Sequence, residues 1–397
     1  MLNQRGVCGV FDPGRRFESL WLVVVIWAVL TCPKIARALD HVVISRDGRE
    51  QHITGQILSD AVDGSLLVID REAQLWAVQA DELVGRTQDD APYQPMQLDE
   101  LGERLMEYMP AGSRRHATAH YLICYNTSPA YAQWCGALYE RLYLAFCNYW
   151  ERRGFRLKEP DTPLVALVFD TKQAYERYAR PELGDAAGGI VGYYNLQTNR
   201  VAMYDLTGTN GLQHSRRGLT STAQINSLLM RPEAYRMVAT IIHEATHQLA
   251  YNCGLQTRLA DIPYWVSEGL AVYFETPDLR SSRGWRNIGG VNRHRLSQFR
   301  EYLGERPSDS LQTLLQDNKR FMSLQTGTEA YAEAWALNYY LIRNHREAYL
   351  EYMKILAQKP PVVYDTPQER LQEFQRAFGT NLDDLDEDFL RYIRTVR

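Results

Sequence analysis

The stretch Met237–Asn252, with the sequence MVATIIHEATHQLAYN, constrains the fold more than any other part of this chain. Its apolar residues recur at helical spacing and no glycine or proline interrupts them, so the pattern predicts a helix. Side chains four residues apart lie on one face of a helix. His243 and His247 therefore present two imidazoles to the same point, with Glu244 beside them. This arrangement is typical of a metal site with a general base attached.

Two imidazoles leave a catalytic zinc ion one short of its usual three protein ligands. Glu268 is the predicted third ligand, in a second expected helix, Pro263–Phe274, opened by Asp261 as its cap and Pro263 in its first turn. Glu275, seven residues past Glu268 on nearly the same helical face, is the alternative ligand. Two other interpretations stay open: a histidine pair satisfied within the core, and a site that keeps its ligands without activity.

These two segments resemble the gluzincin metallopeptidases, zincins whose third zinc ligand is a downstream glutamate. The letters HEATH at 243–247 fit the helix motif, and WVSEGLA at 265–271 is similar to the W-x-x-E-G-x-A segment of aminopeptidase-type members. From Tyr121 to about Arg397, the order of elements also resembles the peptidase-MA-like domain of secreted bacterial proteins. The resemblance implies a zincin-like fold, a Zn2+ cofactor and a peptide or protein substrate.

Site roles follow from the same resemblance. It implies that His243, His247 and Glu268 are the zinc ligands, Glu244 the catalytic base, and Tyr331 the donor to the oxyanion. Tyr331 is implied by its place about 60 residues past the glutamate ligand. Tyr340, His294 and His345 are the alternatives for this last role.

The sequence departs from the gluzincin pattern in two informative places. Aminopeptidases carry a Gly-x-Met-Glu-Asn segment that holds the free amine of the substrate, whereas residues 188–195 read GGIVGYYN and contain no carboxylate. We therefore expect an endopeptidase. Thermolysin-like enzymes have an aspartate four residues past the glutamate ligand to orient a histidine, and Val272 stands there instead. Asp261 is the predicted substitute.

The N-terminus has the pattern of a cleavable signal peptide over residues 1–38. Three arginines precede the apolar run Leu20–Leu30, and Ala36-Arg37-Ala38 supplies the small-x-small cleavage pattern. Eleven apolar residues are too few to span a bilayer, which needs about 20, so we expect a secreted or periplasmic protein with no stable membrane span. An uncleaved N-terminal anchor is the alternative.

Charge argues against a nucleic-acid partner. Removing residues 1–38 takes away five basic and two acidic side chains, so the net charge of −4 becomes −7. No basic run with interleaved aromatic residues remains.

The mature chain is predicted to be α+β, with a small β unit ahead of the catalytic domain. Residues 39–86 contain short strand-like runs separated by the turn signals Asp47-Gly48 and Asp63-Gly64, which favour an SH3-like barrel of four or five strands. This unit is either a partner-binding module or a structural addition. Residues 87–97 are the expected linker.

The catalytic domain is expected to occupy residues 98–397. An α+β lobe over 98–276 should hold a mixed or mostly antiparallel sheet and the zinc motif, and residues 277–397 should form an all-helical lobe. Zincins bind substrate as an added strand at the sheet edge beside the motif helix. The predicted edge strand is Gly189–Tyr194 or Arg200–Tyr204. A polar loop over the cleft entrance is expected at Thr207–Leu228.

Four cysteines remain after residue 38: Cys124, Cys135, Cys147 and Cys253. Cys135 and Cys147 fall in one expected helix, about 18 Å apart along its axis, and cannot bond each other. Two pairings stay open, as do four isolated thiols.

Taken together, the sequence predicts an exported zinc metallopeptidase, and the alternative is an inactive zinc-binding or partner-binding extracytoplasmic protein.

Overall fold

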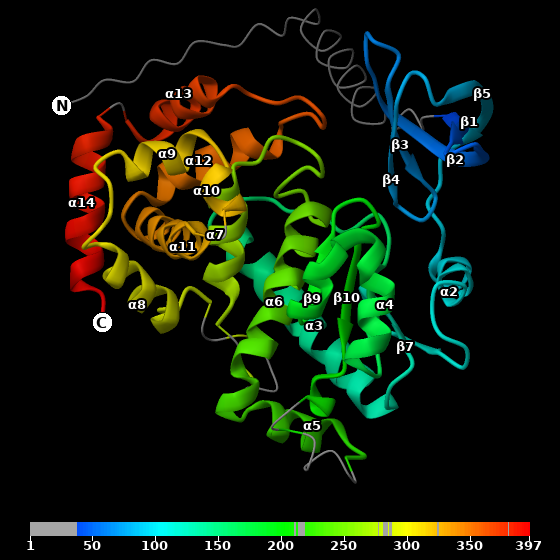
Figure 1. The fold of residues 1–397 in the computed structure, drawn as a ribbon, viewed down its shortest axis with the longest axis horizontal. Coiled ribbons are helices and arrows are strands. Elements are labelled where there is room, and N and C mark those ends of the chain that lie inside the picture. The colour runs from blue at the N-terminus through cyan, green and yellow to red at the C-terminus, as the bar shows by residue number, and fades with distance from the viewer. Residues whose placement is uncertain are drawn as a thin grey trace, which may run out of the picture. The chain divides into compact units, whose positions relative to one another are not determined.

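The computed structural model describes residues 38–397, apart from 210–211, 213–218, 277, 281–284, 286–287, 324 and 380 (Figure 1). Apart from Ala38, the predicted signal peptide lies outside the described residues. The chain divides into two compact units, the first comprising the described residues up to Val68 and Ala77–Gln94, and the second Ile69–Trp76 and Pro95–Arg397. None of the helices that the structure describes is long and apolar enough to cross a membrane.

The N-terminal sheet contains five antiparallel strands in the order β4-β3-β2-β1-β5. Asp47 and Gly48 both have positive φ, 54° and 73°, as the tight turn between β1 and β2 requires. The predicted β unit is therefore present as a meander whose last strand returns beside the first. The strand bounds are Ala38–Arg46 (β1), Arg49–Asp60 (β2), Leu66–Asp70 (β3), Leu75–Val78 (β4) and Leu83–Pro92 (β5).

The segment predicted as a linker begins as a strand. β5 continues to Pro92, because β1 offers it a partner along its length, with Asp40 opposite Gln88 and Ala38 opposite Pro92. The amide of Gln88 also donates to the carboxylate of Asp40, at 2.9 Å. Strand pairing thus outweighs a local composition rich in Asp, Pro and Gln.

A second, mixed sheet forms the α+β part of the larger unit, in the order β6-β7-β8-β10-β9. β7–β8 and β8–β10 are parallel pairs, while β6–β7 and β10–β9 are antiparallel. Because β10 is paired on both sides, it cannot accept a substrate strand, and that alternative prediction is wrong. The bounds are Arg114–Ala117 (β6), Tyr121–Tyr125 (β7), Leu164–Phe169 (β8), Gly192–Asn195 (β9) and Arg200–Tyr204 (β10).

Helices pack against this sheet, and one of them carries the histidine motif. The buried amide of Gln248 in α6 donates to the carbonyls of Val165 and Asn199, at 3.0 and 3.1 Å. These bonds fix α6 against the sheet and so determine where its histidines lie. The helices are α2 (Leu98–Met106), α3 (Pro129–Glu151), α4 (Lys172–Leu183), α5 (Thr222–Leu229), α6 (Pro232–Asn252) and α7 (Tyr264–Phe274), with 3-10 turns at Gly184–Gly189 and Leu206–Gly208.

From Arg293 onward the described chain is mostly helical, as predicted. These helices are drawn in yellow to red in Figure 1 and gather around α11. The structure adds the short α10, which the sequence pattern does not predict. The bounds are Arg293–Tyr302 (α8), Ser310–Gln316 (α9), Lys319–Met322 (α10), Gly327–Asn344 (α11), Arg346–Ala357 (α12), Pro367–Phe378 (α13) and Leu382–Thr395 (α14).

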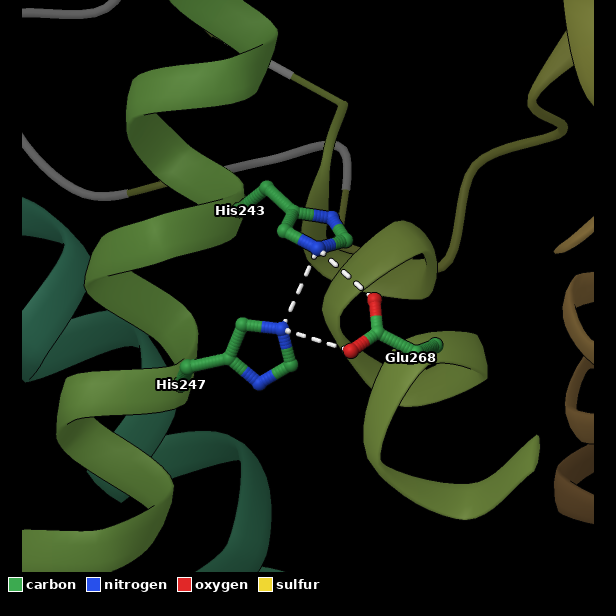
Figure 2. Close-up of side chains that lie close together, drawn as sticks. All are labelled: His243, His247 and Glu268. Atoms are coloured by element: carbon green, nitrogen blue, oxygen red, sulfur yellow. Dashed lines mark hydrogen bonds and ion pairs between the residues drawn. The ribbon is translucent and has the colours of Figure 1, made fainter. Parts of the chain in front are cut away.

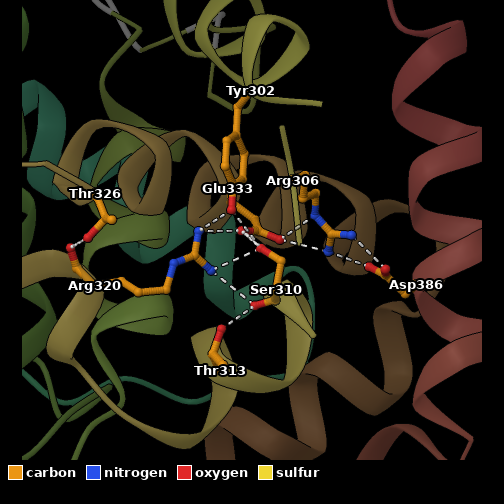
Figure 3. A network of polar contacts seen from close by, with 8 residues as sticks. All are labelled: Tyr302, Arg306, Ser310, Thr313, Arg320, Thr326, Glu333 and Asp386. Atoms are coloured by element: carbon orange, nitrogen blue, oxygen red, sulfur yellow. Dashed lines mark hydrogen bonds and ion pairs between the residues drawn. The ribbon is translucent and has the colours of Figure 1, made fainter. Parts of the chain in front are cut away.

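A buried polar network holds the helical region together (Figure 3). Glu333 in α11 is 0% exposed and accepts hydrogen bonds from Arg306 at 2.9 Å, Arg320 at 2.8 Å and Ser310 at 2.7 Å. Arg306 also binds both carboxylate oxygens of Asp386 in α14, at 2.6 and 2.7 Å. One carboxylate therefore connects segments that are far apart in the sequence.

The contact between α7 and α11 depends on a glycine. A β-carbon at Gly269 would lie 2.6 Å from the carbonyl oxygen of Ala334 and closer still to the amide of Asn338. That amide already donates to the carbonyl of Trp265 at 2.7 Å. The absence of a side chain at Gly269 thus allows α7, which carries Glu268, to pack closely against α11.

Gly269→Ala is therefore expected to lower the free energy of unfolding by about 1–3 kcal/mol, the usual cost of overpacking a close helix contact. Gly304→Ala is the matched control, because the nearest atom to its added β-carbon lies 3.9 Å away. It should change stability by less than about 0.5 kcal/mol. Urea unfolding of both variants measures the difference. Equal stability would show that the helix contact relaxes without cost.

Candidate metal centre

The histidine motif lies in the middle of α6, with Pro232 in the first turn of the helix. Its residues Ile241, Ile242 and Ala245 are buried, so the apolar face is held in the core. His243 and His247 then project one turn apart from the adjacent face toward α7 (Figure 2).

Three donor atoms converge between α6 and α7: the Nε2 atoms of His243 and His247 and the carboxylate of Glu268. The two Nε2 atoms are 3.1 Å apart. Nε2 of His243 lies 3.2 Å from Oε2 of Glu268, and Nε2 of His247 lies 3.4 Å from Oε1. Tetrahedral zinc with ligands at about 2.0–2.1 Å separates them by about 3.3–3.4 Å. One carboxylate oxygen of Glu268 therefore faces each imidazole, and one ligand atom from each residue lies within 4.8 Å of the others, so the three residues form a candidate metal-binding triad.

The charges at this triangle are complementary. Burial alone would lower the pKa of His243, but the carboxylates of Glu268 and Glu275 raise it well above its usual value. Burial alone would raise the pKa of Glu268, but His247 and His243 hold it far below its usual range. Glu268 is therefore ionised, as a metal ligand must be.

Glu244 lies beside the triangle and contacts the edge of the mixed sheet. Its Oε2 accepts a hydrogen bond of 2.8 Å from the backbone N–H of Tyr194 in β9. Burial raises the pKa of this carboxyl group. The motif glutamate thus connects the candidate metal centre to the edge strand.

Two side chains that the sequence analysis did not assign as orienting groups support the histidines. Oε2 of Glu275 lies 3.6 Å from Nδ1 of His243, and Oγ of Ser267 lies 3.3 Å from Nδ1 of His247. Both contact the ring nitrogen away from the triangle, as groups that orient metal-binding histidines do. Glu275, the alternative ligand, therefore contacts a histidine from outside the triangle. Ser267 directly precedes Glu268 in α7, and Glu275 is the C-cap residue of that helix, seven residues past Glu268, so the sequence signal for both was their spacing from Glu268.

Asp261 does not have the predicted roles. It neither caps α7, whose N-cap is Pro263 without a side-chain bond, nor contacts a histidine. Its carboxylate instead receives two hydrogen bonds from the guanidinium of Arg370 in α13 and one from the backbone N–H of Asp365. A bidentate guanidinium satisfies a buried carboxylate better than a helix cap does, so Asp261 binds Arg370 and does not cap α7.

Tyr331 in α11 lies next to the triangle. Its hydroxyl lies close to Glu268, and the guanidinium of Arg295 lies 5.3 Å from its ring centre. Burial raises the pKa of Tyr331, so the hydroxyl stays protonated and can donate. Its rivals have other partners: Tyr340 and His345 bond each other at 3.0 Å, and His294 contacts Arg236.

Removing either supporting group is expected to weaken zinc binding by about 10- to 100-fold, the usual effect of losing a partner of a metal-binding histidine. The variants are Glu275→Ala and Ser267→Ala, measured by competition with a zinc chelator. Ser297→Ala is the control, because its hydroxyl donates to the exposed Glu301, at 3.0 Å. Wild-type affinity in both test variants would mean that the histidines need no such support.

Comparison with protein-family models matches residues 237–363 to a family described as "Protein of unknown function (DUF1570)". The matched stretch contains the three residues of the triangle, together with Glu244 and Tyr331. Comparison with curated proteins found no match. The chain is thus similar, over this stretch, to a family without an assigned function, and the matched stretch coincides with the candidate metal centre.

Proposed function

We propose that this protein is an exported zinc metallopeptidase of the gluzincin type, acting within peptide chains. The observation that carries the proposal is the convergence of His243, His247 and Glu268 between α6 and α7, with Glu244 beside them. When bound, zinc would act as a Lewis acid and lower the pKa of a coordinated water toward about 7.

Glu244 has the place and the chemistry of the general base. Its carboxylate takes a proton from the attacking water and later returns it to the leaving amine. Burial raises its pKa, which brings it closer to the value that suits proton transfer near neutral pH. The bond from Tyr194 N–H, at 2.8 Å, holds it at the sheet edge where a substrate would bind.

β9 is the proposed binding strand for an extended substrate. Tyr194 pairs with Val201 and Gly192 with Met203, and the N–H of Tyr194 points away from β10 toward Glu244. Alternation along a strand turns the backbone groups of Gly192 the same way. A peptide added at this edge would place its own backbone beside Glu244. No carboxylate lies within GGIVGYYN to hold a free amine, which favours internal cleavage.

Tyr331 is the proposed donor to the oxyanion that forms when the carbonyl is attacked. Tyr331→Phe removes only the hydroxyl, so zinc content should stay the same while kcat/KM falls by about 100- to 1,000-fold. Tyr364→Phe is the control, because that side chain is 68% exposed and lies outside the site. If Tyr331→Phe cleaves at the wild-type rate, the hydroxyl does not act in catalysis.

The function is tested with the purified chain, assayed on a mixture of unlabelled peptides of 8–20 residues, about 30–70 Å when extended. We expect cleavage that stops after zinc is removed with a chelator and returns with one equivalent of zinc. A protein that binds zinc tightly and cleaves no peptide would support the alternative, an inactive zinc-binding or partner-binding protein.

The export part of the proposal rests on residues 1–38 and is tested separately. Expression in a bacterium followed by N-terminal sequencing of the extracytoplasmic fraction should give a chain that begins at Leu39. Retention of the N-terminus in the membrane fraction would instead support the uncleaved anchor.

A further inference from the structure

A cleft of about 700 Å³ lies in the larger unit, where α11 ends and α12 begins. Its volume is in the range of small-molecule binding sites. Three arginines line this cleft, which we call the arginine cleft: Arg153 follows the end of α3, Arg343 is in the last turn of α11, and Arg346 is the first residue of α12. The fold thus brings three cationic side chains from distant parts of the chain to one cleft.

None of these three arginines forms an ion pair with a carboxylate among the residues that the structure describes. Each instead contacts a backbone carbonyl oxygen: Arg153 that of Tyr149 at 2.9 Å, Arg343 that of Gly289 at 3.0 Å, and Arg346 that of Arg152 at 3.5 Å. A carbonyl carries no net charge. These contacts therefore position the side chains and leave their positive charge unbalanced.

Arg153 also has an unsatisfied hydrogen-bond donor. Its Nε–H is buried and has no partner within the described part of the chain. The guanidinium lies 3.5 Å from the ring centre of Tyr149, so its plane is held by the ring. Because a buried donor without a partner costs free energy, the orphan N–H indicates an acceptor that the chain itself does not provide.

The charge of the arginine cleft indicates the class of ligand. Its described lining has three arginines and one carboxylate, Glu347, so three positive charges and one negative charge leave a net +2. His345 also lines the cleft, but burial lowers its pKa, so the imidazole is neutral near pH 7. A phosphate monoester carries a charge of about −1.5 to −2 at pH 7 and three acceptor oxygens. A carboxylate carries one charge, which one guanidinium can satisfy.

We propose that the arginine cleft binds a soluble phosphate monoester, with the phosphate group held by Arg153, Arg343 and Arg346. Planar guanidinium groups donate pairs of hydrogen bonds to phosphate oxygens, and three of them surround a tetrahedral dianion better than a planar carboxylate. The remainder of the ligand would fill the rest of the cleft volume.

The arginine cleft is separate from the candidate metal centre. None of the three residues of the triangle lines it. Arg343 lies 12 residues beyond Tyr331 in α11, about 18 Å along the helix axis. Phosphate binding should therefore depend neither on zinc nor on peptidase activity. Since zinc with an open coordination position can itself bind phosphate, the experiment has to distinguish the two sites.

The test is calorimetric titration of the purified chain with inorganic phosphate and with phenyl phosphate, in zinc-loaded and in chelator-treated samples. We expect the same affinity in both samples. Arg346→Gln and Arg343→Gln should each weaken binding by about 10- to 100-fold, because each removes one charged donor to the phosphate. Two variants are used so that the result does not depend on one of them folding, and thermal unfolding without ligand checks both.

Arg391→Gln is the matched control. That side chain is 71% exposed, pairs with Asp388 and does not line the arginine cleft, so the variant should bind phosphate as the wild type does. Equal affinity of the wild type and both cleft variants would overturn the proposal. The same conclusion follows if binding disappears when zinc is removed, or if neither probe binds at up to about 10 mM.

A lipid headgroup is the other source of a phosphate monoester. The chain is therefore mixed with vesicles of phosphatidylcholine that contain or lack phosphatidic acid, and sedimented. We expect no difference between the two vesicles, because a cleft suited to a small molecule encloses its ligand. Retention on phosphatidic acid that phenyl phosphate does not displace would show a lipid-binding surface and contradict a soluble ligand.

Discussion

Glu244→Gln is expected to keep its zinc and to lose peptide hydrolysis by about 100- to 10,000-fold, the range for removal of a general acid–base group. Glutamine cannot accept the proton of the attacking water. Its side-chain oxygen can still accept the hydrogen bond from Tyr194 N–H, so the fold at the sheet edge should persist. The measurement is kcat/KM on one cleaved peptide, together with zinc content.

The matched control is Glu233→Gln in the first turn of the same helix, where the side chain is exposed. It makes the same chemical change away from the triangle and should retain activity. Equal cleavage by wild type and Glu244→Gln would remove Glu244 from the mechanism. Loss of zinc from Glu244→Gln would instead mean that this residue belongs to the metal site.

Glu333→Ala is expected to destabilise the protein by about 3–5 kcal/mol, the usual cost of leaving buried charges without their partner. Glu333 is 0% exposed, and its removal would leave the guanidinium of Arg320 without a carboxylate. Arg306, 4% exposed, would keep only Asp386. The loss arises from the two arginines that remain buried, and it does not measure a net gain from the ion pairs themselves. Urea unfolding of the helical region measures it.

An exposed ion pair provides the comparison. Glu351 and Lys354 are 2.7 Å apart, and their side chains are 64% and 40% exposed. Glu351→Ala should change stability by less than about 1 kcal/mol, because surface pairs contribute little. If Glu333→Ala also changes stability by less than about 1 kcal/mol, the network in Figure 3 is hydrated or rearranges on mutation.

The sequence predicts the helical half of the candidate site well because that information is local. His243 and His247 are four residues apart, so helix geometry alone brings them together. To predict Glu268 as the third ligand, a second helix and the resemblance to the gluzincins were needed. The structure places its carboxylate 3.2 Å from Nε2 of His243. The strand Leu164–Phe169 is also evident from local sequence, since a buried strand is a continuous apolar run.

The features that the sequence does not predict depend on packing between distant segments. Asp261 binds Arg370, 109 positions away, and no local pattern indicates that partner. Ser267 and Glu275 lie beside the histidines because of the way α6 and α7 meet.

Zinc-edge anomalous scattering from crystals of the zinc-loaded chain tests the central claim most directly. The account predicts one peak, about 2.0–2.2 Å from Nε2 of His243, Nε2 of His247 and a carboxylate oxygen of Glu268, with a solvent oxygen as the fourth ligand. A peak elsewhere in the molecule, or a fourth protein ligand that closes the site, would contradict it.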